Sequence, residues 1–454
     1  MKKLALTILA VLLLTLAACG AAPAPAPDTD PDGEQQPVLL EINGFMESLD
    51  NDLLTVADEQ GVIHTFAAGA AEISGDYPLE VGCPVTVSFA EDAPDIALEI
   101  CVLGPPREVA RARQIMDGMS IEEKVGQMFL ARCPEYDGAE EAARLHLGGY
   151  VLFDRDFAYY SFDGAKARIA SYQQAADLPM FMAVDEEGGE VVRISCYPAY
   201  RYERFASPQE VYDEGGLDAL SADAREKAAL LLSLGVNVDL APVADVSTSP
   251  YDFIYSRSLG QDAETTAHAV AAIVKGLEQV GVSACLKHFP GYGDNGDTHS
   301  GVETDYREAG VFYEQDLLPF RSGIEAGADF VLVSHNIVTA FDPELPSSLS
   351  PAVHSLLRDE LGYDGLIITD DLAMEGVAGL YGVDETAVLA VLAGNDMLLS
   401  SDPEEQINAV LQAVETGRVS QELIDSAVER ILRTKIKAGL IPLSEPAAGE
   451  DAAA

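Results

Sequence analysis

Eight short apolar segments recur between Val125 and Ser401, and most are separated by stretches long enough to form a helix. Alternation of buried strands with helices is typical of parallel sheets, and eight such units favour a closed (β/α)8 barrel over an open doubly wound sheet. The predicted barrel strands are Met128–Leu130, Gly149–Phe153, Met180–Val184, Val236–Leu240, Ser283–Leu286, Phe330–Val333, Leu366–Ile368 and Met397–Leu399. We therefore predict an α/β fold whose main body is a TIM barrel.

A small β-rich domain is predicted ahead of the barrel, over residues 38–104. Short β-branched runs broken by turns are typical of a small barrel or sandwich. Cys83 and Cys101 could form one disulfide there if the protein is exported. A Gly-Pro-Pro boundary follows, after which we expect the barrel domain over 105–441 and an unstructured tail over 442–454. The predicted strands of the small domain are Val38–Ile42, Leu53–Val56, Val62–Phe66, Val85–Phe89 and Ile96–Val102.

The first residues have the pattern of a secretion signal. Two lysines precede an apolar run, and small residues then lead into Leu-Ala-Ala-Cys, which resembles the cleavage box of bacterial lipoproteins. We expect a signal peptide over 1–18, lipidation at Cys19 and an extended Pro/Ala/Asp-rich tether over 19–37. The sequence thus predicts an exported protein that is lipid-anchored to the outer face of the bacterial cell membrane.

The charge balance excludes some classes of partner. The chain has 27 Lys+Arg against 76 Asp+Glu, a formal net charge of −49 at pH 7. A surface that acidic repels polyanions, so nucleic-acid binding is not expected. The 6 cysteines include no Cys-x-x-Cys pair, which argues against a zinc ribbon or a thioredoxin-type site. We expect neither a metal nor another cofactor, and the oligomeric state stays open.

Charged side chains follow several of the predicted strands. Because reactive groups in such barrels lie at the C-terminal ends of the strands, we expect these side chains to meet on one rim. Each also has a structural explanation, since a single strand-end aspartate is more often a helix cap and His335 could be a core histidine. Candidate residues are Asp185 and Arg193 after the third strand, Arg257 in the segment after the fourth, Lys287 and His288 after the fifth, His335 after the sixth, and Asp370 and Asp371 after the seventh.

A Gly-rich loop after the fifth strand contains Asp297 and His299. An aspartate two residues before a histidine can hydrogen-bond to the imidazole, which fixes its tautomer and raises its basicity. Such a pair can transfer protons near neutral pH. Alone the signal is weak, because both residue types are common in turns.

The motifs together resemble family 3 glycoside hydrolases, over roughly residues 108–440, and the Asp-x-His loop is similar to that of the β-N-acetylglucosaminidase branch. The segments that carry the resemblance are Met119–Met128, Asp185–Arg193, Ala241–Val243, Lys287–Gly291, Asp297–His299 and Ile368–Met374. The chain departs from the usual pattern at Tyr292 and Glu190, where the family commonly has His and Arg.

The resemblance implies a retaining hydrolysis of terminal β-linked N-acetylhexosamine, with cell-wall fragments as the expected oligosaccharide. Asp370 would be the nucleophile, and His299, oriented by Asp297, would be acid and then base. A carboxylate and an imidazole would thereby replace the two carboxylates that most glycosidases use. The positions that would hold the sugar in the first subsite are Asp185, Arg193, Arg257, Lys287 and His288.

Other functions remain open at this point. Within the family, β-glucoside hydrolysis or phosphorolysis would use the same barrel. A metal-dependent amidohydrolase is disfavoured, because none of the 7 histidines forms a His-x-His pair. A catalytically inactive wall-binding lipoprotein is also conceivable, although decay would normally break the Asp-x-His pair or the nucleophile motif.

Overall fold

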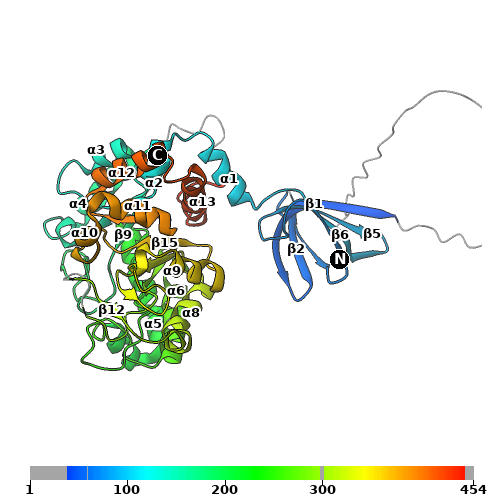
Figure 1. The fold of residues 1–454 in the computed structure, drawn as a ribbon. Coiled ribbons are helices and arrows are strands. Elements are labelled where there is room, and N and C mark those ends of the chain that lie inside the picture. Colours follow the sequence, from blue (N-terminus) through cyan, green and yellow to red (C-terminus); the bar gives the residue numbers. More distant parts are fainter. Residues whose placement is uncertain (1–37, 59, 297–300, 445–454) are drawn as a thin grey trace, which may run out of the picture.

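The computed structural model describes residues 38–58, 60–296 and 301–444, which form a small β domain and a larger α/β domain (Figure 1). The predictions for the signal peptide, Cys19, the tether and the last ten residues lie outside this range. Within the described residues, no helix is both long and apolar enough to cross a membrane.

The larger domain is built on the predicted eight-stranded parallel sheet. The strands lie in the order β15-β13-β11-β10-β9-β8-β7-β16, so neighbours along the chain are neighbours in the sheet. A parallel bridge between Ile368 and Met397 brings the last strand beside β15 and nearly closes the barrel. The strands are β7 Phe129–Arg132, β8 Gly149–Leu152, β9 Phe181–Val184, β10 Val238–Asp239, β11 Ser283–Phe289, β13 Phe330–Val333, β15 Leu366–Thr369 and β16 Leu398–Ser400. All eight predicted strands are therefore confirmed.

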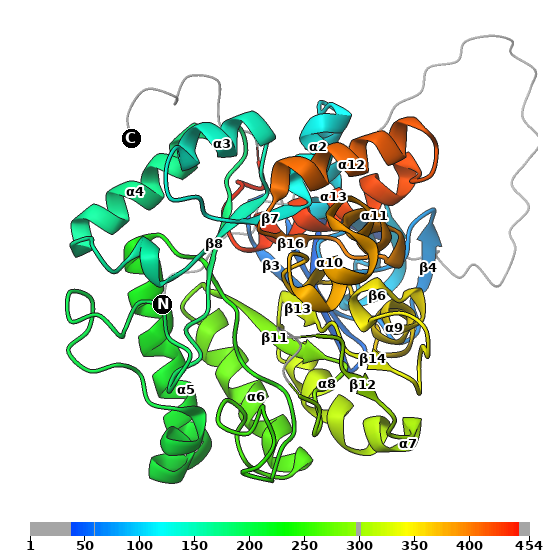
Figure 2. The same cartoon turned by 60° about the vertical axis from the view of Figure 1, so that its left-hand side comes forward.

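Helices surround the sheet (Figure 2). Several begin at side-chain caps: the Ser120 hydroxyl accepts from the Glu123 amide at 3.2 Å, and the Glu123 carboxylate accepts from the Ser120 amide at 2.6 Å. The main helices are α1 Arg107–Met116, α2 Ile121–Gln127, α3 Gly138–Leu145, α4 Phe162–Ala175, α5 Pro208–Leu234, α6 Ala263–Glu278, α8 Leu317–Glu325, α9 Pro351–Ser355, α11 Val383–Ala393, α12 Pro403–Glu415 and α13 Gln421–Lys437, with short helices α7 Ala309–Val311 and α10 Glu375–Tyr381.

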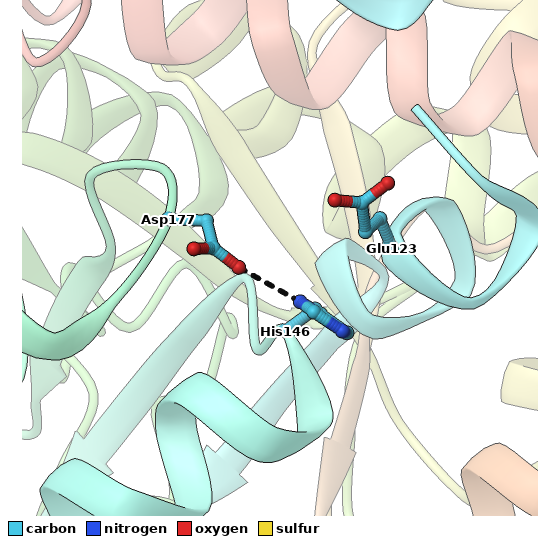
Figure 3. Close-up of side chains that lie close together, drawn as sticks. All are labelled: Glu123, His146 and Asp177. Carbon is cyan, nitrogen blue, oxygen red and sulfur yellow. Dashed lines mark hydrogen bonds and ion pairs between the residues drawn. The ribbon is translucent and has the colours of Figure 1, made fainter. Parts of the chain in front are cut away.

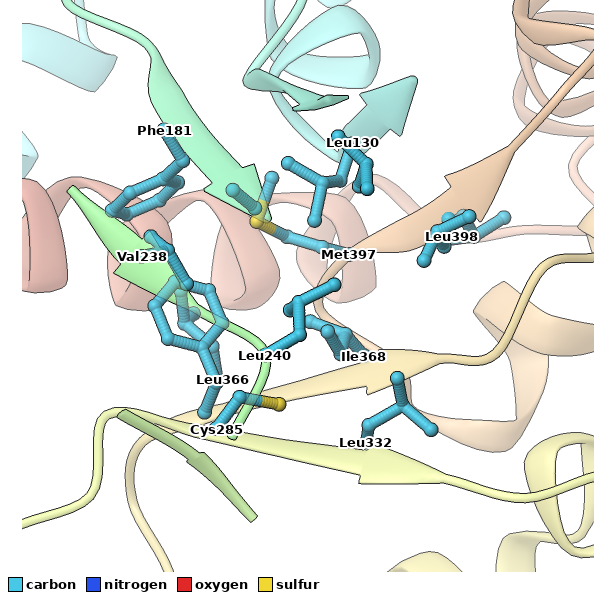
Figure 4. Packing of buried hydrophobic residues seen from close by; sticks show 14 of the residues in the cluster. Leu130, Phe181, Val238, Leu240, Cys285, Leu332, Leu366, Ile368, Met397 and Leu398 are labelled. Carbon is cyan, nitrogen blue, oxygen red and sulfur yellow. The ribbon is translucent and has the colours of Figure 1, made fainter. Parts of the chain in front are cut away.

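Apolar side chains from successive strands fill the barrel interior (Figure 4). Phe181 packs edge to face on Phe330, with ring centroids 5.1 Å apart. Strands that are buried on both faces explain why the sequence shows continuous apolar runs and not alternation. The interior is therefore a packed core, and chemistry is restricted to the ends of the strands.

The small domain forms a closed ring of strands. β1 pairs with β2 and β5, β2 pairs with β3, and β6 pairs with β5 and, through Ala67 and Ile96, with β3. The strands are β1 Leu39–Asp50, β2 Leu53–Asp58, β3 Ile63–Ala67, β4 Glu72–Gly75, β5 Pro84–Ala90 and β6 Ala93–Val102. This confirms the five predicted strands; β4, with Ile73 as its only large apolar residue, was not predicted.

Cys83 and Cys101 are both free thiols, so the disulfide that the sequence left open is not present in this structure. Cys101 lies opposite Thr86 in the antiparallel pair of β5 and β6. Cys83 is buried on the same side as Val85, whereas Thr86 and Cys101 belong to the other face. Alternation of side chains along the strand therefore directs the two sulfur atoms to opposite faces.

The small domain joins the barrel at the end where the strands begin. The Arg107 guanidinium of α1 lies over the Phe45 ring, 4.4 Å from its centroid, and Arg113 donates to Glu429 of α13 at 2.6 Å. At that same end, Lys435 of α13 donates to the side chain of Gln127 at 2.6 Å, just before β7. Helices α1 and α13 thus cover the N-terminal end of the barrel and leave the opposite end to the loops.

Candidate active site

Four of the six predicted site residues that the structure describes lie at the C-terminal ends of strands, and Arg193 and Arg257 lie in the loops that follow. Asp185 directly follows β9, Lys287 and His288 lie near the end of β11, and Asp370 directly follows β15. Parallel register brings these strand ends to one rim, with Val184 beside Asp239 and Lys287 beside Leu332. The rim expected from the sequence is therefore present.

Lys287 joins two carboxylates at this rim. Its Nζ lies 2.7 Å from Asp185 Oδ1 and 2.6 Å from Glu187 Oε1. Arg257 donates to both oxygens of Glu187, from Nη2 at 2.7 Å and from Nε at 3.0 Å. Asp185 is also reached by Arg193, at 3.5 Å. Four of the five residues predicted for the first subsite are thus linked, and Glu187 is a member that the prediction missed.

The charged groups of this cluster shift one another's pKa values towards the charged forms. Burial alone would raise the pKa of Glu187, but Lys287 and Arg257 outweigh it and lower that pKa to about 2. Burial would likewise lower the pKa of Lys287, yet Asp185 and Glu187 raise it above its ordinary value. The cluster therefore holds Glu187 and Lys287 in their charged forms, and charged groups of this kind can bind hydroxyl and amide groups.

His288 is held by an acid that the sequence analysis did not single out. Its Nδ1 lies 2.7 Å from Asp245 Oδ2, and its backbone N–H donates to the same oxygen at 3.1 Å. Arg257 Nη2 lies 3.3 Å from His288 Nε2. With Nδ1–H directed at the carboxylate, Nε2 is left to accept from Arg257. Asp245 lies after Pro242, just beyond the fourth barrel strand, and this position is the signal that could have identified it.

Arg193 is positioned through its backbone. The buried carboxylate of Glu186 accepts from the amides of Arg193 and Ile194, both at 2.9 Å, and of Ser195, at 3.1 Å. This folds the segment after β9 back over the strand end. The Arg193 side chain then lies between Asp185 and Asp154, at 3.5 and 3.6 Å.

Asp370 and Asp371 have different surroundings. The Asp371 carboxylate accepts from the Ser401 hydroxyl at 2.6 Å and from the Ala373 amide at 2.9 Å, and burial raises its pKa. Asp370 accepts from the Asp371 amide at 2.8 Å and is half-buried at the strand end. Asp371 is therefore engaged in fixing the turn, whereas Asp370 lies at the place expected of a reacting carboxylate.

Asp297 and His299 lie outside the described residues. Both flanks of their segment are anchored at the rim. On one side the Tyr292 amide donates to Asp245 Oδ1 at 2.7 Å. On the other, strand β12 (Thr304–Asp305) pairs with β14 (Ile337–Val338), which directly follows the end of β13. Buried His335, close to that strand end, contacts the Ser348 hydroxyl at 2.7 Å and the Asp371 carbonyl at 3.1 Å.

One possible group of metal ligands among the described residues lies at the other end of the barrel (Figure 3). Glu123, His146 and Asp177 each precede a strand, and His146 Nδ1 lies 2.9 Å from Asp177. Glu123 already caps α2 through Ser120. This trio, in which only Asp177 is exposed, therefore belongs to the helix termini and is separate from the strand-end rim.

Comparison with known proteins agrees with this architecture. Residues 120–434 match the glycosyl hydrolase family 3 N-terminal domain. "Beta-hexosaminidase LpqI" from Mycobacterium tuberculosis is 31% identical over 363 residues, which is 77% of this chain and 90% of the relative. A beta-hexosaminidase from Vibrio cholerae is 33% identical over 282 residues, covering 61% of this chain and 81% of its own.

A solved structure is also similar. A family 3 beta-N-acetylglucosaminidase from a Paenibacillus species superposes with a TM-score of 0.67 at 32% identity, over 71% of this chain and 63% of that protein. The family match covers more than half of the chain and includes every strand of the barrel. The protein therefore belongs to glycosyl hydrolase family 3 and is a glycoside hydrolase.

Proposed function

We propose that the protein is a retaining exo-β-N-acetylglucosaminidase. The observation that carries the proposal is the strand-end rim, where the linked cluster of Asp185, Lys287, Glu187 and Arg257 lies at the same end of the barrel as Asp370. The cations and carboxylates suit the hydroxyl and acetamido groups of one terminal sugar. The similar proteins named beta-hexosaminidase or beta-N-acetylglucosaminidase support the choice of substrate.

The reaction would proceed in two displacements. Asp370 attacks the anomeric carbon while the bond between that carbon and the leaving oxygen breaks, and His299 gives the leaving oxygen a proton. Water then loses a proton to His299 and attacks the same carbon, which releases Asp370. Asp297 would orient the imidazole, and Asp185, Arg193, Arg257, Lys287 and His288 would hold the sugar. Two inversions at one carbon retain the β configuration.

The first test compares two aryl glycosides in buffer with and without phosphate. We expect residues 38–454 to hydrolyse p-nitrophenyl β-N-acetylglucosaminide with a kcat/KM at least about tenfold above that for the β-glucoside, because site polar groups left unpaired by a missing acetamide cost binding energy. Preference for the glucoside would contradict the proposed substrate. A sugar 1-phosphate as the main product would contradict hydrolysis and indicate a phosphorylase.

We also propose that the enzyme acts outside the cell on muropeptide fragments or related amino sugars, anchored through a lipid on Cys19. The support is the lipoprotein-like box and the tether that follows it. In a bacterial host, Cys19→Ser should move the protein from the membrane fraction to the soluble fraction while its specific activity stays the same. Cys196→Ser, which removes an exposed thiol of the barrel domain, is the matched control. Unchanged fractionation of the Cys19 variant would rule out lipid anchoring.

A further inference from the structure

We propose that Glu187 is a positioning residue, whose carboxylate holds Lys287 and Arg257 side by side so that both can bind the terminal sugar. The inference rests on the proposed function, because it assigns a task to a residue beside the proposed first subsite. Glu187 itself is only 3% exposed and is surrounded by the groups that it binds.

One oxygen of Glu187 lies between the two cations. Oε1 accepts from Lys287 Nζ at 2.6 Å and from Arg257 Nη2 at 2.7 Å, so these nitrogens are no more than about 5.3 Å apart. Two like charges at that separation repel strongly where water is largely excluded. The carboxylate of Glu187 lies between the two cations, so it offsets their repulsion and fixes the distance between them.

The second oxygen sets the orientation of Arg257. Oε2 accepts from Nε at 3.0 Å, so the guanidinium is bound through one edge. Nη2 also meets Nε2 of His288, whose ring is fixed by Asp245. Within the described residues, Nη1 has no hydrogen bond, and its two N–H groups are the donors left for a ligand. Glu187 therefore determines the direction in which the Nη1 donors of the Arg257 guanidinium point.

Glu187 also influences the charge of Lys287. The Lys287 side chain is 2% exposed, and burial by itself favours the neutral form of its amine. Asp185 and Glu187 are the two carboxylates that oppose burial and raise its pKa. Removing the charge of Glu187 leaves one of them, so the amine should lose its proton at a lower pH.

Glu186 offers a matched comparison. It neighbours Glu187 in sequence and is fully buried, yet among the described residues its carboxylate accepts only from backbone amides of the segment 193–195. A substitution there removes a buried carboxylate and loosens a loop, but it leaves Lys287 and Arg257 with Glu187. The two variants therefore separate the positioning of Lys287 and Arg257 from support of the loop that carries Arg193.

The experiment measures kcat and KM of Glu187→Gln, Glu187→Asp and Glu186→Gln on the acetamido aryl glycoside between pH 5 and 10. For Glu187→Gln we expect kcat/KM to fall about 100-fold, mainly through KM, and the alkaline limb of the pH profile to move to lower pH. Glu187→Asp keeps the charge with a shorter reach, so its loss should be smaller and its alkaline limb should stay in place. Equal losses in Glu187→Gln and Glu186→Gln, with the same pH profile as the wild type, would overturn the proposal.

A double-mutant cycle tests the contact without any turnover. The unfolding equilibrium in urea is measured for the wild type, Glu187→Gln, Lys287→Met and the double variant. If Glu187 holds Lys287, the losses of the two single variants should not be additive. The unfolding constant of the double variant should then be at least about tenfold smaller than the value expected from adding the two single losses in free energy. Additive effects would contradict the positioning role even if every variant is inactive. If the wild type cleaves neither glycoside but the cycle shows strong coupling, the proposed function is rejected while the positioning contact between Glu187 and Lys287 stands.

Discussion

Replacing Asp370 by alanine is expected to lower kcat/KM on p-nitrophenyl β-N-acetylglucosaminide by more than about a thousandfold, because no covalent intermediate can form without its carboxylate. The fold should persist, since Asp370 is half-buried at the end of β15 and its backbone still donates to the Val333 carbonyl at 3.1 Å. Circular dichroism and the urea midpoint check the fold, and released nitrophenol measures turnover.

Asp371→Asn is the control for this variant. Asp371 is adjacent, but its carboxylate is bound to Ser401 and the Ala373 amide, so its loss should weaken the turn and lower activity far less. Residual activity of Asp370→Ala above about a thousandth of the wild type, or a larger loss in Asp371→Asn, would assign the nucleophile elsewhere. NMR of the first product should show the β anomer if Asp370 takes part in a double displacement.

Replacing His299 by alanine should have an effect that depends on the leaving group. kcat/KM reports the first displacement, in which the leaving oxygen receives a proton. Nitrophenolate leaves without one, so kcat/KM on the aryl substrate should change little, whereas a β-linked N-acetylglucosamine disaccharide should lose about 100- to 10,000-fold. The second displacement still needs a base, so kcat should fall on both substrates.

His64→Ala is a suitable control, because His64 lies in the small domain and pairs with Asp58 at 2.8 Å, away from the barrel. Its kinetics should match those of the wild type. Equal losses of kcat/KM on the aryl glycoside and the disaccharide in His299→Ala would show that the imidazole serves binding or folding. It would then not be the general acid.

The barrel could be predicted from the sequence because its signal is local. Each strand is a short apolar run, and several helices begin at a side-chain cap, as at Ser120. The residues proposed for the first subsite could be singled out for a similar reason, since they lie at or just beyond strand ends or match a family motif. Edge strand β4 gave no such signal, because a single isoleucine among small and polar residues does not form a pattern.

The partners of the site residues could not be predicted in the same way. Glu187 binds Arg257 across 70 positions of sequence, and Asp245 binds His288 across 43. Such pairings depend on how parallel strands align, which no local pattern encodes. The sequence left the Cys83–Cys101 disulfide open for a related reason: the spacing of two cysteines says nothing about which face of a strand each one occupies.

The small domain is attached at the end of the barrel that lies opposite the strand-end rim. Its contacts with α1, and those of α1 with α13, are all at the end of the barrel where the strands begin. A resin, an affinity tag or a surface that captures the small domain therefore leaves the substrate-binding end facing bulk solution. Immobilised enzyme should keep its access to large, insoluble polymers when it is held this way, whereas random coupling through surface amines would block part of the population.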